Sequence, residues 1–109
     1  MTTRVLPDFE RRVHDALTAE QPSLRPLEDL ITDGCAAALH LETELARLDR
    51  RREALLDRMG QDPGAAREAL EVSERGREDQ DDLDRVRELL RELMHLRART
   101  RLRQFLAQS

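Results

Sequence analysis

A heptad pattern in the first half of the chain is the feature that most limits what it can fold into. Over five heptads, one set of positions holds Leu27, Gly34, Leu41, Leu48 and Leu55, and the other holds Ile31, Ala38, Leu45, Arg52 and Met59. Such a repeat places one apolar seam along a long helix, and another helix must cover that seam. The pattern therefore predicts a coiled-coil-like α-helix over residues 26–59.

The segment after this helix predicts a chain reversal. It reads Met59-Gly60-Gln61-Asp62-Pro63-Gly64. A glycine that follows a helix commonly adopts a left-handed conformation, which we expect of Gly60. Asp62 is suited to cap a new helix, and Pro63 to be its first residue. We therefore expect an antiparallel helical hairpin centred on Gln61, with a second arm over about 63–107.

The second arm is uneven in its apolar pattern. Residues 71–82 are nearly all polar and include Gly76, so we expect this stretch to be exposed, frayed or broken, with the break near 76–82. After it an apolar face returns that drifts slightly from a strict heptad. Its members are Leu83, Val86, Leu90, Leu93, Met94, Ala98, Leu102 and Phe105.

A short helix over about 7–20 precedes the long one. Phe9, Val13, Ala16 and Leu17 line one of its faces. The segment 21–26 contains two prolines, which end the first helix, and Ser23 is available to cap the next. In the antiparallel register the end of the second arm, with Leu102, Phe105 and Leu106, extends past the long helix. We expect Phe9, Val13 and Leu17 to pack against that end.

These patterns together predict a single all-α domain over residues 1–109, a coiled-coil-like bundle with a short N-terminal helix. The chain has no Trp or Tyr and 2 Phe, while 39% of its residues are charged. Leu, Ala, Arg and Glu are strong helix formers, which suits this architecture. Slim helices without aromatic side chains bury little area per residue, so homodimerisation or binding to a partner is expected.

All 19 basic residues are arginines. We interpret this as the codon bias of a high-GC bacterium such as an actinobacterium, the alternative being selection for bidentate contacts to carboxylates or phosphates. The first residues contain no apolar run of signal-peptide length, and no segment has the apolar length of a membrane span. The single Cys35 is expected to pack beside Ala36, Ala37 and Ala38. A cytoplasmic protein is predicted.

The sequence shows no constellation that specifies catalysis. His40 with Glu44 and Glu92 with His95 have the helical spacing of metal-ligand pairs. Both histidines fall on polar helix faces, however, so we interpret them as surface residues and predict no metal site. A Gly-rich phosphate loop, a nucleophile elbow and a zinc pattern are all absent. We therefore predict a protein that is not an enzyme and has no cofactor.

Two charge clusters also have simple interpretations. Arg97, Arg99, Arg101 and Arg103 alternate near the C-terminus, but the alternation spreads them over different helix faces and the net charge of the chain is −4. These features argue against a nucleic-acid partner, and cations near a helix C-terminus are favoured by the helix dipole. The acidic run 78–82 is typical of a solvated face or a helix start.

The stretch from Asp84 to Arg97, Asp-Arg-Val-Arg-Glu-Leu-Leu-Arg-Glu-Leu-Met-His-Leu-Arg, resembles part of the helical-hairpin anti-sigma factors of actinobacteria that bind cyclic di-GMP. The resemblance covers little more than one helix. That family carries Glu-x3-Ser-x2-Arg-x3-Gln-x3-Asp, and in the register that matches apolar positions only Arg87 agrees. Another register matches Ser73, Gln80 and Asp84 and loses the apolar match. The resemblance implies a related scaffold that could bind a sigma factor without that ligand.

The sequence thus predicts a small regulatory or adaptor protein that binds a protein partner through its helices. The predicted interaction seam comprises Leu27, Ile31, Leu41, Leu45, Leu48, Leu55, Leu83, Val86, Leu90 and Leu93. Arg87 and Arg91 are candidate contacts to a partner or ligand. One alternative is a nucleotide- or metal-responsive sensor that uses these arginines or the histidine pairs. Another is a purely structural oligomerisation module.

Overall fold

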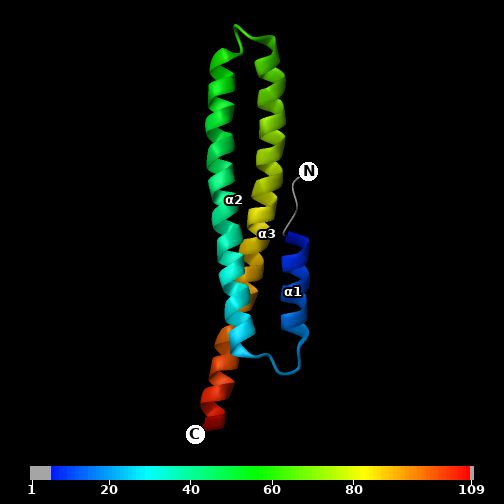
Figure 1. Cartoon of the computed structure of the whole chain (residues 1–109), viewed down its shortest axis with the longest axis vertical. Coiled ribbons are helices and arrows are strands. Elements are labelled where there is room, and N and C mark those ends of the chain that lie inside the picture. The colour runs from blue at the N-terminus through cyan, green and yellow to red at the C-terminus, as the bar shows by residue number, and fades with distance from the viewer. Residues whose placement is uncertain (1–5, 109) are drawn as a thin grey trace. The chain divides into compact units, whose positions relative to one another are not determined.

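The computed structural model describes residues 6–108, and over this range the chain is all-α. It forms α1 (Leu6–Thr18), α2 (Leu24–Arg58) and α3 (Pro63–Gln108), with no strand among the described residues (Figure 1). Residues 1–5, part of the start that lacks a signal-peptide pattern, lie outside that range. None of the three helices is long and apolar enough to cross a membrane. The predicted bounds of the first two helices differ from these by one to two residues.

The described helices divide into two compact units. The first contains α1, residues 24–38 of α2 and residues 85–108 of α3, and the second contains residues 39–84. Both α2 and α3 are continuous through the boundaries at 38/39 and 84/85. In particular, α3 runs without interruption through 71–82, so the break that Gly76 and its polar neighbours suggested is not present.

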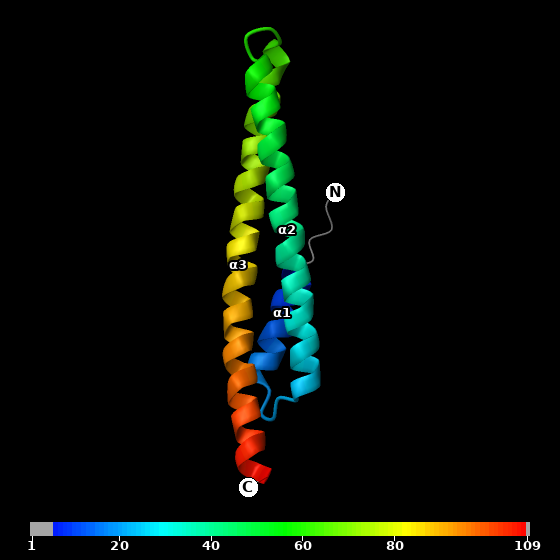
Figure 2. The same cartoon turned by 90° about the vertical axis from the view of Figure 1, so that its left-hand side faces the viewer.

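In the first unit three helical segments share one core. The turn between α1 and α2 is short, so α1 folds back beside the start of α2, and both views place it next to α3 as well (Figure 1, Figure 2). Phe9 and Val13 of α1 are almost completely buried. The core on the other two helices consists of Leu27, Leu30, Ile31 and Ala38 from α2 and Val86, Leu89, Leu90, Leu93 and Leu96 from α3.

The position of α1 corrects one expectation. Phe9 packs at Gly34 and Leu90, and not against the end of α3. Leu102, Phe105 and Leu106 are 58%, 68% and 60% exposed. The reason is the short turn of residues 19–23, which keeps α1 level with the first turns of α2, whereas the end of α3 continues past that turn (Figure 1, Figure 2).

Gly34 allows the close approach of the three segments. A β-carbon at this position would stand 2.6 Å from Cδ2 of Leu90 and 2.7 Å from Cζ of Phe9. Both side chains are buried, so neither can move away without disturbing the core. The glycine in the predicted seam of α2 is thus explained by the volume of the Phe9 ring.

In the second unit the last turns of α2 pack on the first turns of α3, next to the turn that connects the two helices. Leu55 of α2 forms a buried cluster with Ala65 and Ala69 of α3, and the partly buried Val72 packs against it. Arg51 and Glu68 are paired across the same two helices. These contacts join residues of α2 before the turn to residues of α3 after it.

The turn itself bears out part of its prediction. The carboxylate Oδ1 of Asp62 accepts a hydrogen bond from the backbone N–H of Gly64 at 3.0 Å, so Asp62 caps α3 and Pro63 is its first residue. The expectation for Gly60 was wrong, because no glycine from residue 6 to 108 has positive φ. Instead the N–H groups of Gln61 and Asp62 both donate to the carbonyl of Arg58, at 3.0 and 2.9 Å.

Along α3 the inward positions keep a strict heptad spacing from Ala65 to Thr100. They are Ala65, Ala69, Val72, Gly76, Asp79, Leu83, Val86, Leu90, Leu93, Arg97 and Thr100, and each is buried or partly buried. The predicted drift toward Met94, Ala98, Leu102 and Phe105 is wrong, since these four side chains are exposed. The polar Thr100 is accepted in the core because its hydroxyl donates to the carbonyl of Leu96 at 2.8 Å.

Candidate interaction surface

The predicted interaction seam lies inside the chain. Eight of its ten residues are buried and the other two, Leu41 and Leu45, are partly buried. The buried ones are Leu27, Ile31, Leu48, Leu55, Leu83, Val86, Leu90 and Leu93. These side chains are therefore used within the units, and a surface for a partner must be sought among the exposed residues.

Two other positions of the predicted heptad pattern, Arg52 and Met59, are exposed. Arg52 is exposed because its position opens onto an open groove of about 230 Å³ in the second unit. Gly76 lines the same groove and presents no side chain to fill it. Met59, 43% exposed, follows the last residue of α2. Arg52 therefore lies where the facing helix offers too little volume, and Met59 lies beyond the helix.

Asp79 is the acidic member of the α3 heptad set. Partial burial raises the pKa of its carboxyl group above the ordinary value, nearby Arg75 opposes this, and the negative charges of Asp82, Glu44 and Glu78 add to the rise. The second unit thus carries Gly76 and Asp79 at two consecutive inward positions, where a heptad helix normally has large apolar side chains. Its packing is correspondingly weaker there.

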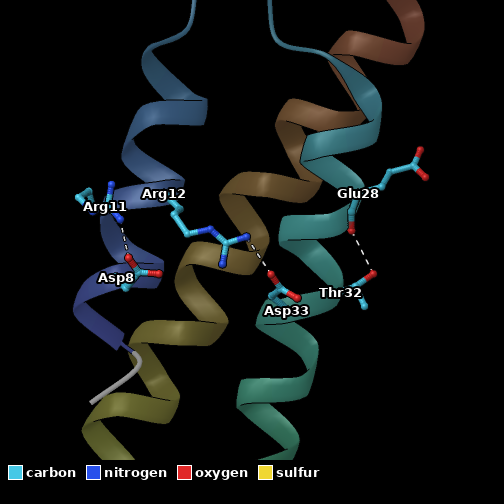
Figure 3. A network of polar contacts seen from close by, with 6 residues as sticks. All are labelled: Asp8, Arg11, Arg12, Glu28, Thr32 and Asp33. Atoms are coloured by element: carbon cyan, nitrogen blue, oxygen red, sulfur yellow. Dashed lines mark hydrogen bonds and ion pairs between the residues drawn. The ribbon is translucent and has the colours of Figure 1, made fainter. Parts of the chain in front are cut away.

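Exposed ion pairs connect the helices of the first unit. Arg12 of α1 reaches Asp33 of α2 at 2.8 Å, as Figure 3 shows. Arg85 of α3 pairs with Glu10 of α1, and Arg101 of α3 with Glu28 of α2, both at 3.3 Å. Burial lowers the pKa of Arg85, but its hydrogen bonds to Glu88 and Glu10 raise it on balance. Exposed pairs of this kind contribute about 0–1 kcal/mol each, so they fix register more than stability.

An apolar stripe remains exposed on the last part of α3. We call it the distal stripe; it comprises Met94, Ala98, Leu102, Phe105 and Leu106, all exposed. At about 100° per residue these five positions lie on one side of the helix, roughly opposite the buried positions Leu93, Leu96 and Thr100. Up to Thr100 this part of α3 therefore has two apolar faces, of which the unit covers one, and from residue 101 to 108 every residue is exposed.

Arginines border the distal stripe on both sides. By the same helical geometry Arg97 and Arg101 fall along one edge, and Arg99 and Arg103 along the other. Residues 93–109 contain no Asp or Glu. The sequence analysis interpreted these four arginines as spread over different helix faces. They lie instead along the two edges of one apolar stripe.

Arg87 and Arg91, the candidate contact residues, are exposed on α3. They precede Met94 and Ala98 at helical spacing, so they lie on the same side of the helix as the distal stripe. The structure thus places them at the N-terminal end of this face. Sequence reasoning had singled them out through a family resemblance and not through this arrangement.

The remaining reactive side chains do not assemble into a site in the described part of the chain. His14, His40 and His95 are exposed, and no three His, Cys, Asp or Glu residues among those described could hold a metal ion together. Cys35 is exposed, which corrects the expectation that it packs with the alanines beside it. Only Ala38 of that group is buried, because it alone occupies a seam position.

Sequence reasoning missed several buried residues, and it did not foresee that Met94, Ala98, Leu102, Phe105 and Leu106 are exposed. Leu30 and Leu89 each stand one position before a seam residue, and Leu96 follows Leu93 by three. Adjacent apolar pairs such as Leu30–Ile31 and Leu89–Leu90 were the available signal, since a helix that packs against two others needs a wider apolar face.

The chain matches no protein-family model, no curated protein and no solved structure.

Proposed function

We propose that this chain is a small cytoplasmic regulatory or adaptor protein that works by binding another protein through its helices, and not by catalysis. In this proposal α2 and α3 form an antiparallel hairpin of coiled-coil type that serves as a scaffold. The observation that carries the proposal is the exposure of large apolar side chains on a highly charged helical protein. They are Leu39, Leu56, Leu70, Leu102, Phe105 and Leu106.

Exposed apolar side chains that share one helix face are the usual basis of helix-mediated recognition. The seam residues within the two units are already covered, so the side chains left outside are available for a second protein. A sigma factor, which the resemblance of residues 84–97 implies, is one partner of this kind. The proposed homodimer is a second way to cover the same residues.

The test begins with the purified full chain. Light-scattering mass and far-UV circular dichroism establish whether it is a helical monomer or a dimer. Immobilised chain is then exposed to lysate of a high-GC actinobacterium, and captured proteins are identified and reproduced as purified pairs with a measured Kd. A saturable one-to-one complex supports the adaptor.

Two results would count against this function. A stable homodimer that captures no protein favours a purely structural oligomerisation module. Stabilisation of the chain by a nucleotide or a divalent metal in a thermal-shift assay, without any protein partner, favours the sensor.

A further inference from the structure

We infer that the distal stripe of α3 binds an amphipathic helix of a partner protein whose apolar face is bordered by acidic side chains. This inference rests on the proposed function and specifies the surface and the chemistry of the partner. Two independent features support it, namely the apolar face that the first unit leaves uncovered and the sign of the charges along its edges.

The apolar feature has the spacing that helix recognition requires. Met94, Ala98, Leu102 and Phe105 follow one another by three or four residues, so they form a continuous row over more than three turns. At the C-terminal end of this row Leu102, Phe105 and Leu106 are all more than half exposed. Water contact with a Phe and two Leu on one face is unfavourable, and a helix laid along the row would remove it.

The charge feature selects the partner. The edges of the row carry Arg97 and Arg101 on one side and Arg99 and Arg103 on the other; residues 93–109 contain no Asp or Glu, and Arg101 is paired with Glu28 of α2. A helix that lies on the row brings its own flanking side chains next to these guanidinium groups. Glu and Asp at those flanks would form paired, bidentate contacts, whereas Lys and Arg would be repelled.

A second copy of this chain does not meet that requirement. Two distal stripes packed face to face would place Arg97, Arg99, Arg101 and Arg103 of one chain against the same four of the other, and Glu28, the carboxylate at this edge, is already paired with Arg101 within each chain. The acidic run 78–82 has the right charge, but no large apolar side chain is exposed along it in the described structure. The chemistry therefore points to a different protein.

Polyanions fit less well than an acidic helix. A nucleic acid or a phosphate-rich surface would use the arginines and leave the row of apolar side chains without a complementary surface. The net charge of −4 also repels a polyanion from the chain as a whole. One partner can contact both the arginines and the apolar row of α3 only if it has an apolar face bordered by acidic side chains.

The experiment uses the full chain and a defined probe. The probe is a fluorescein-labelled helical peptide with Leu along one face, Glu at both flanks and Ala elsewhere; a companion peptide has Lys in place of Glu. We expect the Glu peptide to bind at least about tenfold more tightly than the Lys peptide in fluorescence anisotropy, and more weakly at high salt. The double variant Leu102→Glu/Phe105→Glu should weaken this binding at least about tenfold.

Matched variants show whether the effect belongs to the distal stripe. Leu39→Glu/Leu70→Glu introduces the same charges at two other exposed leucines, both in the second unit, and should bind the Glu peptide like the unmodified chain. All variants alter exposed positions, so their circular dichroism should equal that of the unmodified chain. Arg99→Glu/Arg103→Glu should remove most of the preference for the Glu peptide, because one edge then carries Glu while the other still carries Arg97 and Arg101.

Several outcomes would overturn the inference. Equal affinity for both peptides would show that the stripe does not bind the probe. So would an equal loss of affinity for the Glu peptide in Leu102→Glu/Phe105→Glu and in Leu39→Glu/Leu70→Glu. Binding to phosphatidylserine vesicles or duplex DNA in place of the Glu peptide assigns the arginines to a polyanion. A dimer that Leu102→Glu/Phe105→Glu converts to monomer assigns the stripe to a second copy. A captured protein that binds this variant undiminished refutes the stripe and leaves the proposed function standing.

Discussion

Phe9 of α1 and Gly34 of α2 occupy one space, because a β-carbon on Gly34 would lie 2.7 Å from Cζ of the Phe9 ring. Gly34→Ala should therefore destabilise the chain by about 1–2 kcal/mol, since overpacking a core costs more than the better helix propensity of Ala returns. Urea denaturation followed by circular dichroism at 222 nm measures the change.

Gly76 provides the matched control for this substitution. It also lies within a helix, but a β-carbon there would meet nothing within 4 Å. Gly76→Ala should stabilise the chain by about 0.5–1 kcal/mol through helix propensity alone. If both alanine variants shift the urea midpoint in the same direction, the close contact of Phe9 with Gly34 is not present in solution.

A charge in the buried seam should unfold its surroundings. Leu48→Asp places a carboxylate at a buried position of α2 and should cost about 3 kcal/mol or more. Leu39→Asp introduces the same group on the same helix at a side chain that is 64% exposed, and should change stability little. Thermal melts of the two variants report the difference, and equal melts would refute the heptad register of α2.

Removal of the cap on α3 should have a moderate effect. Asp62→Ala deletes the oxygen that accepts the N–H of Gly64 and should destabilise the chain by about 1 kcal/mol. Asp62→Asn keeps an oxygen at that place and should retain most of the stability. A loss of equal size in both variants would indicate that the negative charge, and not the hydrogen bond, is what matters at this helix start.

The raised pKa of Asp79 predicts a pH-dependent effect of its removal. The folded chain holds the proton of this carboxyl group more tightly than the unfolded chain, so stability falls as the pH rises through the folded-state pKa. Asp79→Asn should therefore be more stable than the unmodified chain at pH 7, and the gain should vanish below the unfolded value of 3.8. Thermal melts at pH 7 and pH 3 test this.

A substitution with the same change in net charge serves as the reference for Asp79. Asp81→Asn removes a carboxylate from an exposed position of the same helix. Its stability relative to the unmodified chain should depend less on pH than that of Asp79→Asn. If the stability of the two variants changes with pH in parallel, the effect is not specific to Asp79.

The sequence predicts the fold where one type of signal acts alone. The heptad positions of α2 are correct from Leu27 to Leu48 because a single periodic pattern fixes which face is buried. Asp62 and Pro63 are correct because the first turn of a helix depends on neighbouring residues only. The left-handed conformation predicted for Gly60 was wrong because the backbone closes the turn with hydrogen bonds to the carbonyl of Arg58, without positive φ.

Prediction failed where two neighbours compete for one helix face. Met94 and Leu93 are equally apolar, and composition alone does not say that Leu93 faces the core while Met94 faces outward. That choice depends on where α1 lies, which the length of the turn at 19–23 decides. The exposure of the distal stripe was not predicted for the same reason, since the sequence analysis expected α1 to pack on its C-terminal end.

The two inward positions occupied by Gly76 and Asp79 also set how readily parts of α3 open. Amide hydrogens leave a helix by local fluctuations, whose free energy rises with the apolar contacts that each turn makes. The turns around residue 78 have few such contacts, whereas those around residue 90 are held by Val86, Leu89, Leu90 and Leu93. Deuterium should therefore enter the middle of α3, a hydrogen-bonded helix interior, well before it reaches the turns around residue 90.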